Sequence, residues 1–188
     1  MTVVSTRDQI LTLAQKAIAE RGYSSFSFRE LAAELGIKSA SIHYHFPTKT
    51  HLGLEVARSY RQRFETVLHS LSAAEPAAAL TAFTDIYRTE VQTSQRMTVC
   101  MMLAAEIKTL PEEIKHEMEL FYQLNLTWLE AQLVIMELTN TAVLSRQVFA
   151  LLQGGLMGAK TLGDPTYFDD VLGALELILA PVHRTFYD

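Results

Sequence analysis

The chain has 188 residues, 49% of them hydrophobic and 20% charged, and its net charge is −5. This composition is typical of a globular protein of one or two domains with a substantial core, and it excludes a disordered chain. A single cysteine excludes an internal disulfide framework. The sequence has no apolar signal core and no uninterrupted apolar run of about 18 residues. We therefore expect a cytoplasmic protein without a membrane segment.

The first predicted helix is capped by Ser5 or Thr6 and runs to about Arg21, where Gly22 supplies the stop. Its apolar residues follow the i, i+3, i+4, i+7, i+8 spacing of a helix with one buried face. They are Ile10, Leu13, Ala14, Ala17 and Ile18. We expect this helix to support the two shorter helices that follow it.

Two short helices joined by a turn at Gly36 are predicted within residues 27–49, SFRELAAELGIKSASIHYHFPTK. The first begins with a capping box, in which Ser27 accepts from the backbone N–H of Glu30 and the Glu30 carboxylate reaches back to the N–H of Ser27. Gly36 suits the left-handed residue that ends a helix. The second helix begins at Ser39, its predicted N-cap, and runs for about two turns. This arrangement predicts a helix-turn-helix, whose second helix lies in the major groove of DNA.

The second helix has one apolar face and one polar face. Ile42 and Phe46 are four residues apart, so both can pack on the core. A surface helix would usually carry Glu, Lys and Gln on its other face, whereas small residues and aromatic hydrogen-bonding groups suit close approach to base edges and phosphates. The residues of that face are Ser39, Ala40, Ser41, His43, Tyr44 and His45.

A family resemblance rests on the run LAAELGIKSASIHYHFPTKTHL and extends over about residues 7–55. This region resembles the N-terminal DNA-binding region of TetR family transcriptional regulators, in which the recognition helix ends in Tyr/His-His-Phe and is followed by a short turn, a Lys and a Leu. The resemblance implies an all-α protein of about nine helices, with a three-helix helix-turn-helix domain and a C-terminal helical domain that binds a ligand and dimerises. Because the family usually has Tyr at the position of His43, the role of its phosphate-contacting tyrosine could fall to His43 or Tyr44.

The resemblance and groove chemistry together suggest roles for individual residues on operator DNA. Arg29 would reach a base edge or a phosphate, and the polar face of the second helix would line the groove. Lys38 and Lys49 would contact phosphates, and Ser27 could do so in addition to capping its helix. The charge distribution supports this interpretation, because residues 1–70 hold nine Lys/Arg against six Asp/Glu, whereas residues 71–188 hold seven against fifteen.

Residues 48–71 predict a long helix, capped by Thr48, that connects a DNA-binding domain of residues 1–50 to a body of residues 72–188. Residues 72–76 mark the boundary, since Pro76 suits the first turn of a further helix. That body should contain helices at 77–92, at 96–108 (buried on most sides) and from 111 to about 136. No alternation typical of strands occurs, so the predicted fold class is all-α.

Two final helices are predicted at 144–162 and 166–186. The first carries a row of small residues at every fourth position, Ala150, Gly154 and Gly158. These helices could pack within one chain, or they could pair with their copies in a homodimer. The resemblance favours the homodimer, as does the need to read two half-sites one helical turn apart, ~34–36 Å.

The family uses its C-terminal body as a pocket for a small inducer. Methionine and aromatic residues suit an apolar or flat ligand, but residues at the same helical spacing can equally form a plain core. The candidate lining residues are Phe83, Tyr87, Cys100, Met101, Met102, Glu106, Phe121, Tyr122, Trp128, Gln132 and Gln153. Glu106 could meet a cationic ligand or face water, and Cys100 could be a thiol sensor or an inert buried thiol.

No pattern of an enzyme, metal site or cofactor site is found. His43 and His45 are two residues apart on a helix and point ~200° away from each other, so they cannot share one ion. HExxH, paired CxxC and a phosphate-cradling glycine loop are all missing from the sequence. We therefore predict a sequence-specific transcriptional regulator, a repressor released from operator DNA by a small, largely apolar inducer. The alternative is a helical small-molecule-binding protein, or a Cys100 thiol sensor or enzyme, without operator-specific regulation.

Overall fold

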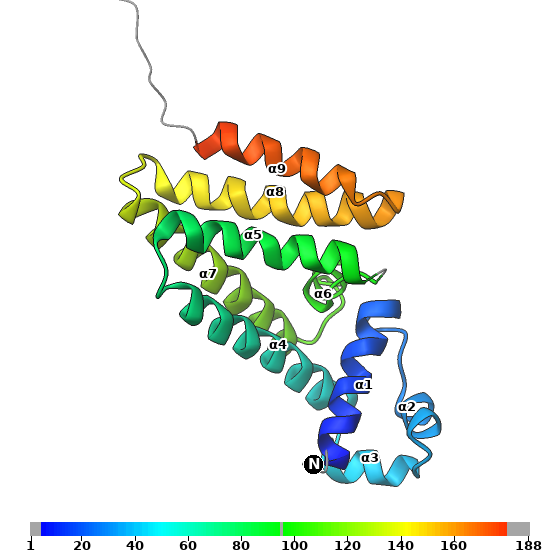
Figure 1. Cartoon of the computed structure of the whole chain (residues 1–188). Coiled ribbons are helices and arrows are strands. Elements are labelled where there is room, and N and C mark those ends of the chain that lie inside the picture. Colours follow the sequence, from blue (N-terminus) through cyan, green and yellow to red (C-terminus); the bar gives the residue numbers. More distant parts are fainter. Residues whose placement is uncertain (1–4, 95, 180–188) are drawn as a thin grey trace, which may run out of the picture. The chain divides into compact units, whose positions relative to one another are not determined.

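The computed structural model describes residues 5–94 and 96–179, which form nine α-helices and contain no strand (Figure 1). The all-α prediction is confirmed. The helices are α1 (Thr6–Arg21), α2 (Phe28–Leu35), α3 (Ser39–His45), α4 (Lys49–Leu71), α5 (Pro76–Thr93), α6 (Val99–Ala105), α7 (Glu112–Ile135), α8 (Thr141–Leu162) and α9 (Thr166–Leu179).

The described residues divide into two compact units, and neither is one continuous stretch of chain. Unit 1 contains residues 5–66 and 96–122, because α6 packs on α1 and brings the first part of α7 with it. Unit 2 contains residues 67–94 and 123–179, and its main contacts join α8 to α9 and α5 to α8. The predicted functional division into 1–50 and 72–188 stays a prediction.

Several helix ends are set by the local signals that the sequence contains. The Ser5 hydroxyl accepts a hydrogen bond from the backbone N–H of Asp8 at the start of α1. The Thr48 hydroxyl accepts from the N–H of His51 at 3.0 Å and so caps α4, as predicted. Pro76 occupies the first turn of α5, where its missing N–H costs no hydrogen bond. Gly163 ends α8 in the left-handed conformation.

Three predicted boundaries were wrong. The predicted helix 96–108 is shorter, because Thr98 caps α6 through the N–H of Met101. After Ala105 the backbone N–H groups bond to carbonyls three residues back in the sequence, so the α-helix ends there. Helix α8 begins three residues before the predicted start at Leu144. Ser39 is the first residue of α3 and not its N-cap, since Lys38 holds the extended cap conformation without a side-chain bond. The predicted extension of the last helix to residue 186 lies outside the described residues.

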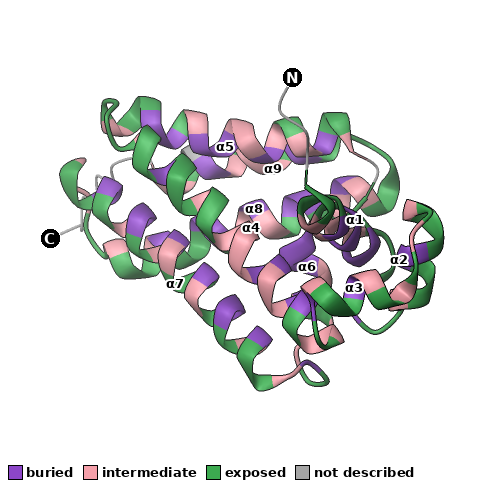
Figure 2. Cartoon of the chain, turned by 90° about the horizontal axis from the view of Figure 1, so that it is seen from below, coloured by how far each residue is buried: buried purple, intermediate pink, exposed green. Residues whose placement is uncertain are grey.

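Most helices have both buried and exposed residues, as the colours of Figure 2 show, whereas α6 is buried on most sides, as predicted. In unit 2, α9 packs closely on α8, and the glycines Gly155 and Gly158 of α8 permit the approach. A Cβ atom at Gly155 would lie 2.9 Å from Cγ1 of Val171 and 3.1 Å from the ring of Phe168. Phe168 is fully buried. Helix α9 therefore packs on α8 within the chain through one of its sides, the side that carries Phe168 and Val171.

Candidate nucleic-acid interface

Helices α1, α2 and α3 form one cluster in unit 1 around side chains that the helical spacing predicted to be buried. The five apolar residues predicted for α1 are all buried. Ile42 and Phe46 are fully buried at one side of α3 and its end. The Arg7 side chain packs against this core. Its guanidinium lies 5.1 Å from the centre of the Phe46 ring and pairs with Glu55 at 2.6 Å.

The turn between α2 and α3 has the geometry of a helix-turn-helix. Both halves of the predicted capping box are present: the N–H of Glu30 donates to Oγ of Ser27 at 3.3 Å, and the N–H of Ser27 donates to Oε2 of Glu30 at 2.9 Å. Hydrogen bonds from the Ser27 side chain and backbone lower the pKa of Glu30. Gly36 is left-handed (φ 65°), and the N–H of Ile37 returns to the carbonyl of Ala32 at 3.0 Å.

Among the predicted groove-facing residues of α3, Ala40 and Tyr44 are two positions from the buried Ile42 and so project from the opposite side of the helix. Tyr44 is 84% exposed. The described surface includes exposed Ala40 and His43, and half-buried Ser39, Ser41 and His45. All six predicted residues therefore lie at the surface of unit 1.

His43 and Tyr44, which share the position of the expected tyrosine, differ in their surroundings. The His43 ring meets the Phe28 ring edge-on at 4.8 Å, and its Nδ1 lies 3.3 Å from the carbonyl oxygen of Pro47. Tyr44 has a ring contact with His45 at 5.1 Å and otherwise projects outward. His43 is thus fixed against α2, whereas the Tyr44 hydroxyl is the more accessible group.

The three basic residues predicted to contact DNA, Arg29, Lys38 and Lys49, have different surroundings in the structure. Arg29 and Lys38 are exposed and form no ion pair with any residue in 5–94 or 96–179. The Lys49 Nζ instead donates to the carbonyl oxygen of Ser24 at 3.1 Å and lies over the rings of Tyr23 and Phe26, at 4.9 and 4.7 Å. Burial lowers the pKa of Lys49, partly offset by the charges of Glu106 and Glu30.

The predicted ligand-binding residues fall into both units. Those in unit 1 are Cys100, Met101, Met102, Glu106, Phe121 and Tyr122. Cys100 is buried, with its Sγ 3.1 Å from Oγ1 of Thr98 and 3.8 Å from the hydroxyl of Tyr60. Phe121 packs on Tyr60, with 5.4 Å between the ring centres. Glu106 accepts hydrogen bonds from the backbone of Ser24, a role that its helical position does not indicate.

The predicted ligand residues in unit 2 centre on an aromatic group. The Phe83 ring lies 5.0 Å from Trp128 and 5.5 Å from Tyr87, and the Trp128 Nε1–H donates to Oγ of Ser72 at 2.9 Å. Gln132 is buried, and so is Oε1 of Gln153, for which no hydrogen-bond donor is found among the described residues. A buried acceptor of this kind costs about 1–3 kcal/mol if nothing satisfies it.

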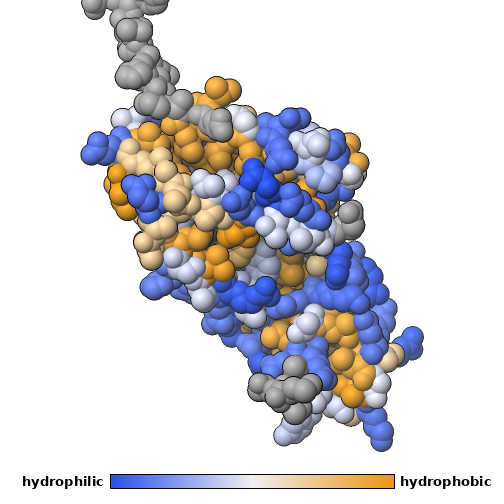
Figure 3. Space-filling model, in the orientation of Figure 1, coloured by the Kyte–Doolittle hydropathy of each residue, from blue (hydrophilic) through white to orange (hydrophobic). Residues whose placement is uncertain are grey.

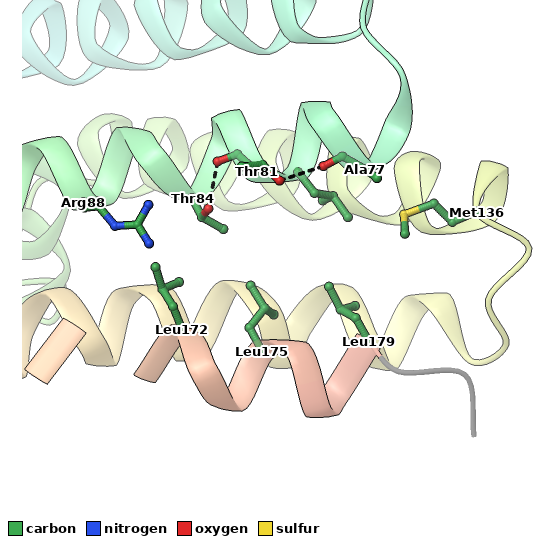
Figure 4. A pocket seen from close by; sticks show the side chains of 9 residues that line it. Ala77, Thr81, Thr84, Arg88, Met136, Leu172, Leu175 and Leu179 are labelled. Atoms are coloured by element: carbon green, nitrogen blue, oxygen red, sulfur yellow. Dashed lines mark hydrogen bonds between the residues drawn. The ribbon is translucent and has the colours of Figure 1, made fainter. Parts of the chain in front are cut away.

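Unit 2 also contains an apolar groove of about 270 Å³ that none of these candidates lines (Figure 4). Figure 4 shows Leu172, Leu175 and Leu179 projecting from α9 toward α5, with Arg88 at one end. Arg88 pairs with Asp85 and, through Nε, with Asp169 at 3.1 Å. The leucine spacing is visible in the sequence, but the spacing does not tell whether a neighbouring helix covers that face or leaves a groove.

Among the described side chains, no group of three His, Cys, Asp or Glu residues is placed to hold a metal ion. No helix within 5–94 and 96–179 has the length and apolar character needed to cross a bilayer.

Comparison with known proteins places the helix-turn-helix in a family. The profile of bacterial regulatory proteins of the tetR family matches residues 10–56. The HTH-type transcriptional repressor KstR2 of Mycolicibacterium smegmatis is 33% identical over 81 residues, which are 41% of this chain and only 38% of that protein.

Two solved structures match over almost the whole chain. A TetR-family regulator from Agrobacterium tumefaciens is 30% identical, with a TM-score of 0.85 over 91% of this chain and 96% of that one. A TetR transcriptional regulator from Legionella pneumophila is also 30% identical, with a TM-score of 0.88 over 94% of this chain and 98% of that one. The protein therefore belongs to the TetR family of DNA-binding transcriptional regulators.

Proposed function

We propose that this regulator binds operator DNA as a two-fold dimer, with α3 of each copy in the major groove, and represses transcription until a small, largely apolar inducer releases it. The observation that carries the DNA-binding part is the two-sided character of α3. Ile42 and Phe46 are fully buried behind the helix, while Tyr44 projects outward with 84% of its surface exposed. Because these two buried side chains anchor α3 to the core, its exposed side has one defined orientation, as recognition of bases in the major groove requires.

Within this proposal the roles of the residues follow from their exposure. The groove-facing set consists of Ser39, Ala40, Ser41, His43, Tyr44 and His45, with Ala40 suited to a thymine methyl group. Arg29 reaches a base edge or a phosphate, and Lys38 a phosphate. Ser27 caps α2, and its phosphate contact requires the hydroxyl to donate to the phosphate in place of Oε2 of Glu30, to which it now donates at 3.0 Å. Lys49 has three donors, of which Ser24 accepts one, so the others remain for a phosphate at the start of α4.

The Lys38→Ala variant tests the phosphate contacts. We expect it to weaken binding to operator and to unrelated DNA alike, and to reduce the slope of log affinity against log salt by about 1, because one released counterion is lost. Fluorescence anisotropy with DNA from upstream of its own gene, at several salt concentrations, measures both. Lys108→Ala removes the same charge from an exposed site after α6 and should leave the slope unchanged. A changed base preference in Lys38→Ala would contradict the phosphate role.

The dimer is proposed to form through α8 and α9, as part of an effector-binding and dimerisation domain of residues 72–188. Supporting this, α8 and α9 expose large apolar side chains, and Figure 3 shows hydrophobic surface over part of unit 2. These side chains are Val143, Met157, Leu162, Tyr167 and Leu177. The small residues Ala150 and Gly154 are also exposed on α8, which would allow a second helix to approach closely. An exposed apolar face of this kind is typical of an interface.

The inducer is proposed to bind in the interior of unit 2, at Phe83, Tyr87, Trp128, Gln132 and Gln153. The aromatic group supplies apolar contact, and a donor on the ligand would satisfy the buried Oε1 of Gln153. The candidates in unit 1 stay predictions. Similarity to a repressor over the matched 81 residues supports repression as the outcome.

The single tryptophan of the chain provides a test for the inducer. We expect an apolar compound that releases operator DNA to change the fluorescence of Trp128, and we expect operator and compound to weaken each other's binding by the same factor. Thr81→Phe, which fills the groove of Figure 4, should leave both effects intact. If Thr81→Phe abolishes them, the inducer occupies the groove instead of the aromatic interior. Equal compound affinity with and without operator would contradict release by that compound.

A further inference from the structure

In the loop between α1 and α2, the backbone N–H and C=O of Ser24 are both hydrogen-bonded to side chains that are distant in the sequence. The backbone N–H of Ser24 donates to the Glu106 carboxylate, at 3.1 Å to Oε2 and 3.4 Å to Oε1. The carbonyl oxygen of the same residue accepts from Nζ of Lys49 at 3.1 Å. All three residues lie in unit 1, so the two peptide groups that flank Ser24 are fixed by the turn after α6 and by the start of α4.

Gly22 makes room for this contact. Its φ is +84°, a conformation that side-chain-bearing residues rarely adopt, and a Cβ atom there would lie 2.6 Å from Oε1 of Glu106. The end of α1 is also tied to the residues that precede α6, because Arg96 pairs with Glu20 at 3.2 Å. The end of α1 and the turn after α6 are therefore built to lie against each other.

We propose that Glu106 is a positioning residue for operator binding: with Lys49 it fixes the backbone on both sides of Ser24 and thereby sets the position of α2 and α3 on α1. The loop runs from Gly22 to the capping box at Ser27, so its conformation determines where α2 begins. This role differs from the ligand contact that the sequence predicts for Glu106. It rests on the proposed DNA contacts of α3, and it adds a residue that touches no DNA.

The consequence for DNA binding follows from pre-organisation. A loop that is already ordered has less conformational freedom to lose when α3 docks, so its restraint favours binding to any sequence. Because Glu106 is not assigned to a phosphate, its removal should release no additional counterion. A positioning role therefore predicts weaker binding at an unchanged salt slope, whereas loss of a phosphate contact changes both.

The test compares Glu106→Ala and Glu106→Gln in the full-length protein, by operator affinity at several salt concentrations and by hydrogen exchange of the Ser24 amide. We expect Glu106→Ala to lower operator affinity about tenfold, the effect of losing one charge-assisted hydrogen bond, with the salt slope unchanged. Exchange of the Ser24 amide should become about tenfold faster. Glu106→Gln keeps a hydrogen-bond acceptor, so it should retain most of the operator affinity and most of the protection of the Ser24 amide from exchange. Glu113→Ala removes an equal charge from an exposed site at the start of α7 and should change neither.

Each other outcome overturns the inference. Faster Ser24 exchange with unchanged operator affinity would show that the contact does not position the motif. A salt slope altered by about 1 would show that the charge of Glu106 acts on DNA directly. Lys38→Ala in the same assay separates this inference from the proposed function, because its reduced slope reports DNA binding through α3 whatever Glu106 does.

Discussion

Replacing Leu177 with arginine should convert the protein to a monomer and lower its operator affinity about a thousandfold, toward the level of non-specific binding. Leu177 is 80% exposed on α9, on the face proposed to meet a second copy. An arginine there would have to lose its hydration inside an apolar interface without a partner, which costs several kcal/mol. A single recognition helix reads few base pairs, so loss of the dimer removes half of the specific contacts. Light scattering and anisotropy at matched concentrations measure the two effects.

Thr89→Arg serves as the control for this variant. It adds the same charge at an exposed position on α5, also in unit 2 but outside α8 and α9. We expect it to leave both mass and operator affinity unchanged. If Leu177→Arg remains dimeric and binds operator normally, the interface lies elsewhere.

Phe46→Ala and Tyr44→Ala should separate folding from DNA reading at two neighbouring aromatic residues. Phe46 is fully buried beneath the guanidinium of Arg7, and truncating a buried phenylalanine costs about 3–5 kcal/mol. Tyr44 is 84% exposed, so its truncation should change the free energy of unfolding by less than about 0.5 kcal/mol. Denaturant unfolding followed by circular dichroism measures this difference.

For Tyr44 we expect a large effect on operator binding, although its truncation hardly changes the free energy of unfolding. Tyr44→Ala should weaken specific binding at full helical content, because its hydroxyl is the accessible aromatic donor of α3. Phe46→Ala should lose binding only in proportion to its unfolded fraction. Normal operator affinity in Tyr44→Ala would assign the role of the family's tyrosine to His43, the other residue at that position.

Local features of unit 1 could be predicted because their causes lie within a few residues. The capping box links Ser27 to Glu30, three residues apart, and Gly36 ends α2 through its own conformation. The burial of Ile42 and Phe46 follows from a spacing of one helical turn. The family resemblance rests on the residue run LAAELGIKSASIHYHFPTKTHL in the same unit. The prediction that the chain is not an enzyme is confirmed by membership in the family.

Contacts between distant parts of the chain could not be predicted in the same way. The bond from Ser24 to Glu106 joins residues 82 positions apart, and no spacing rule connects them. The sequence correctly predicts Lys49 at the start of α4. The direction of its side chain, however, depends on the rings of Tyr23 and Phe26, over which its ammonium group lies. Likewise, helical spacing predicts that Phe83 is buried, but it does not distinguish a ligand-lining residue from ordinary core.

Selection of binding sites from random duplex DNA by the full-length protein tests the central claim most directly. If two copies of α3 read one operator, the recovered sequences should contain two inverted half-sites whose centres lie about 10 base pairs, one helical turn, or a multiple apart. The same selection with Tyr44→Ala should lose preference within the half-sites while keeping their spacing. Recovered sequences without inverted symmetry, or no enrichment at all, would contradict the account.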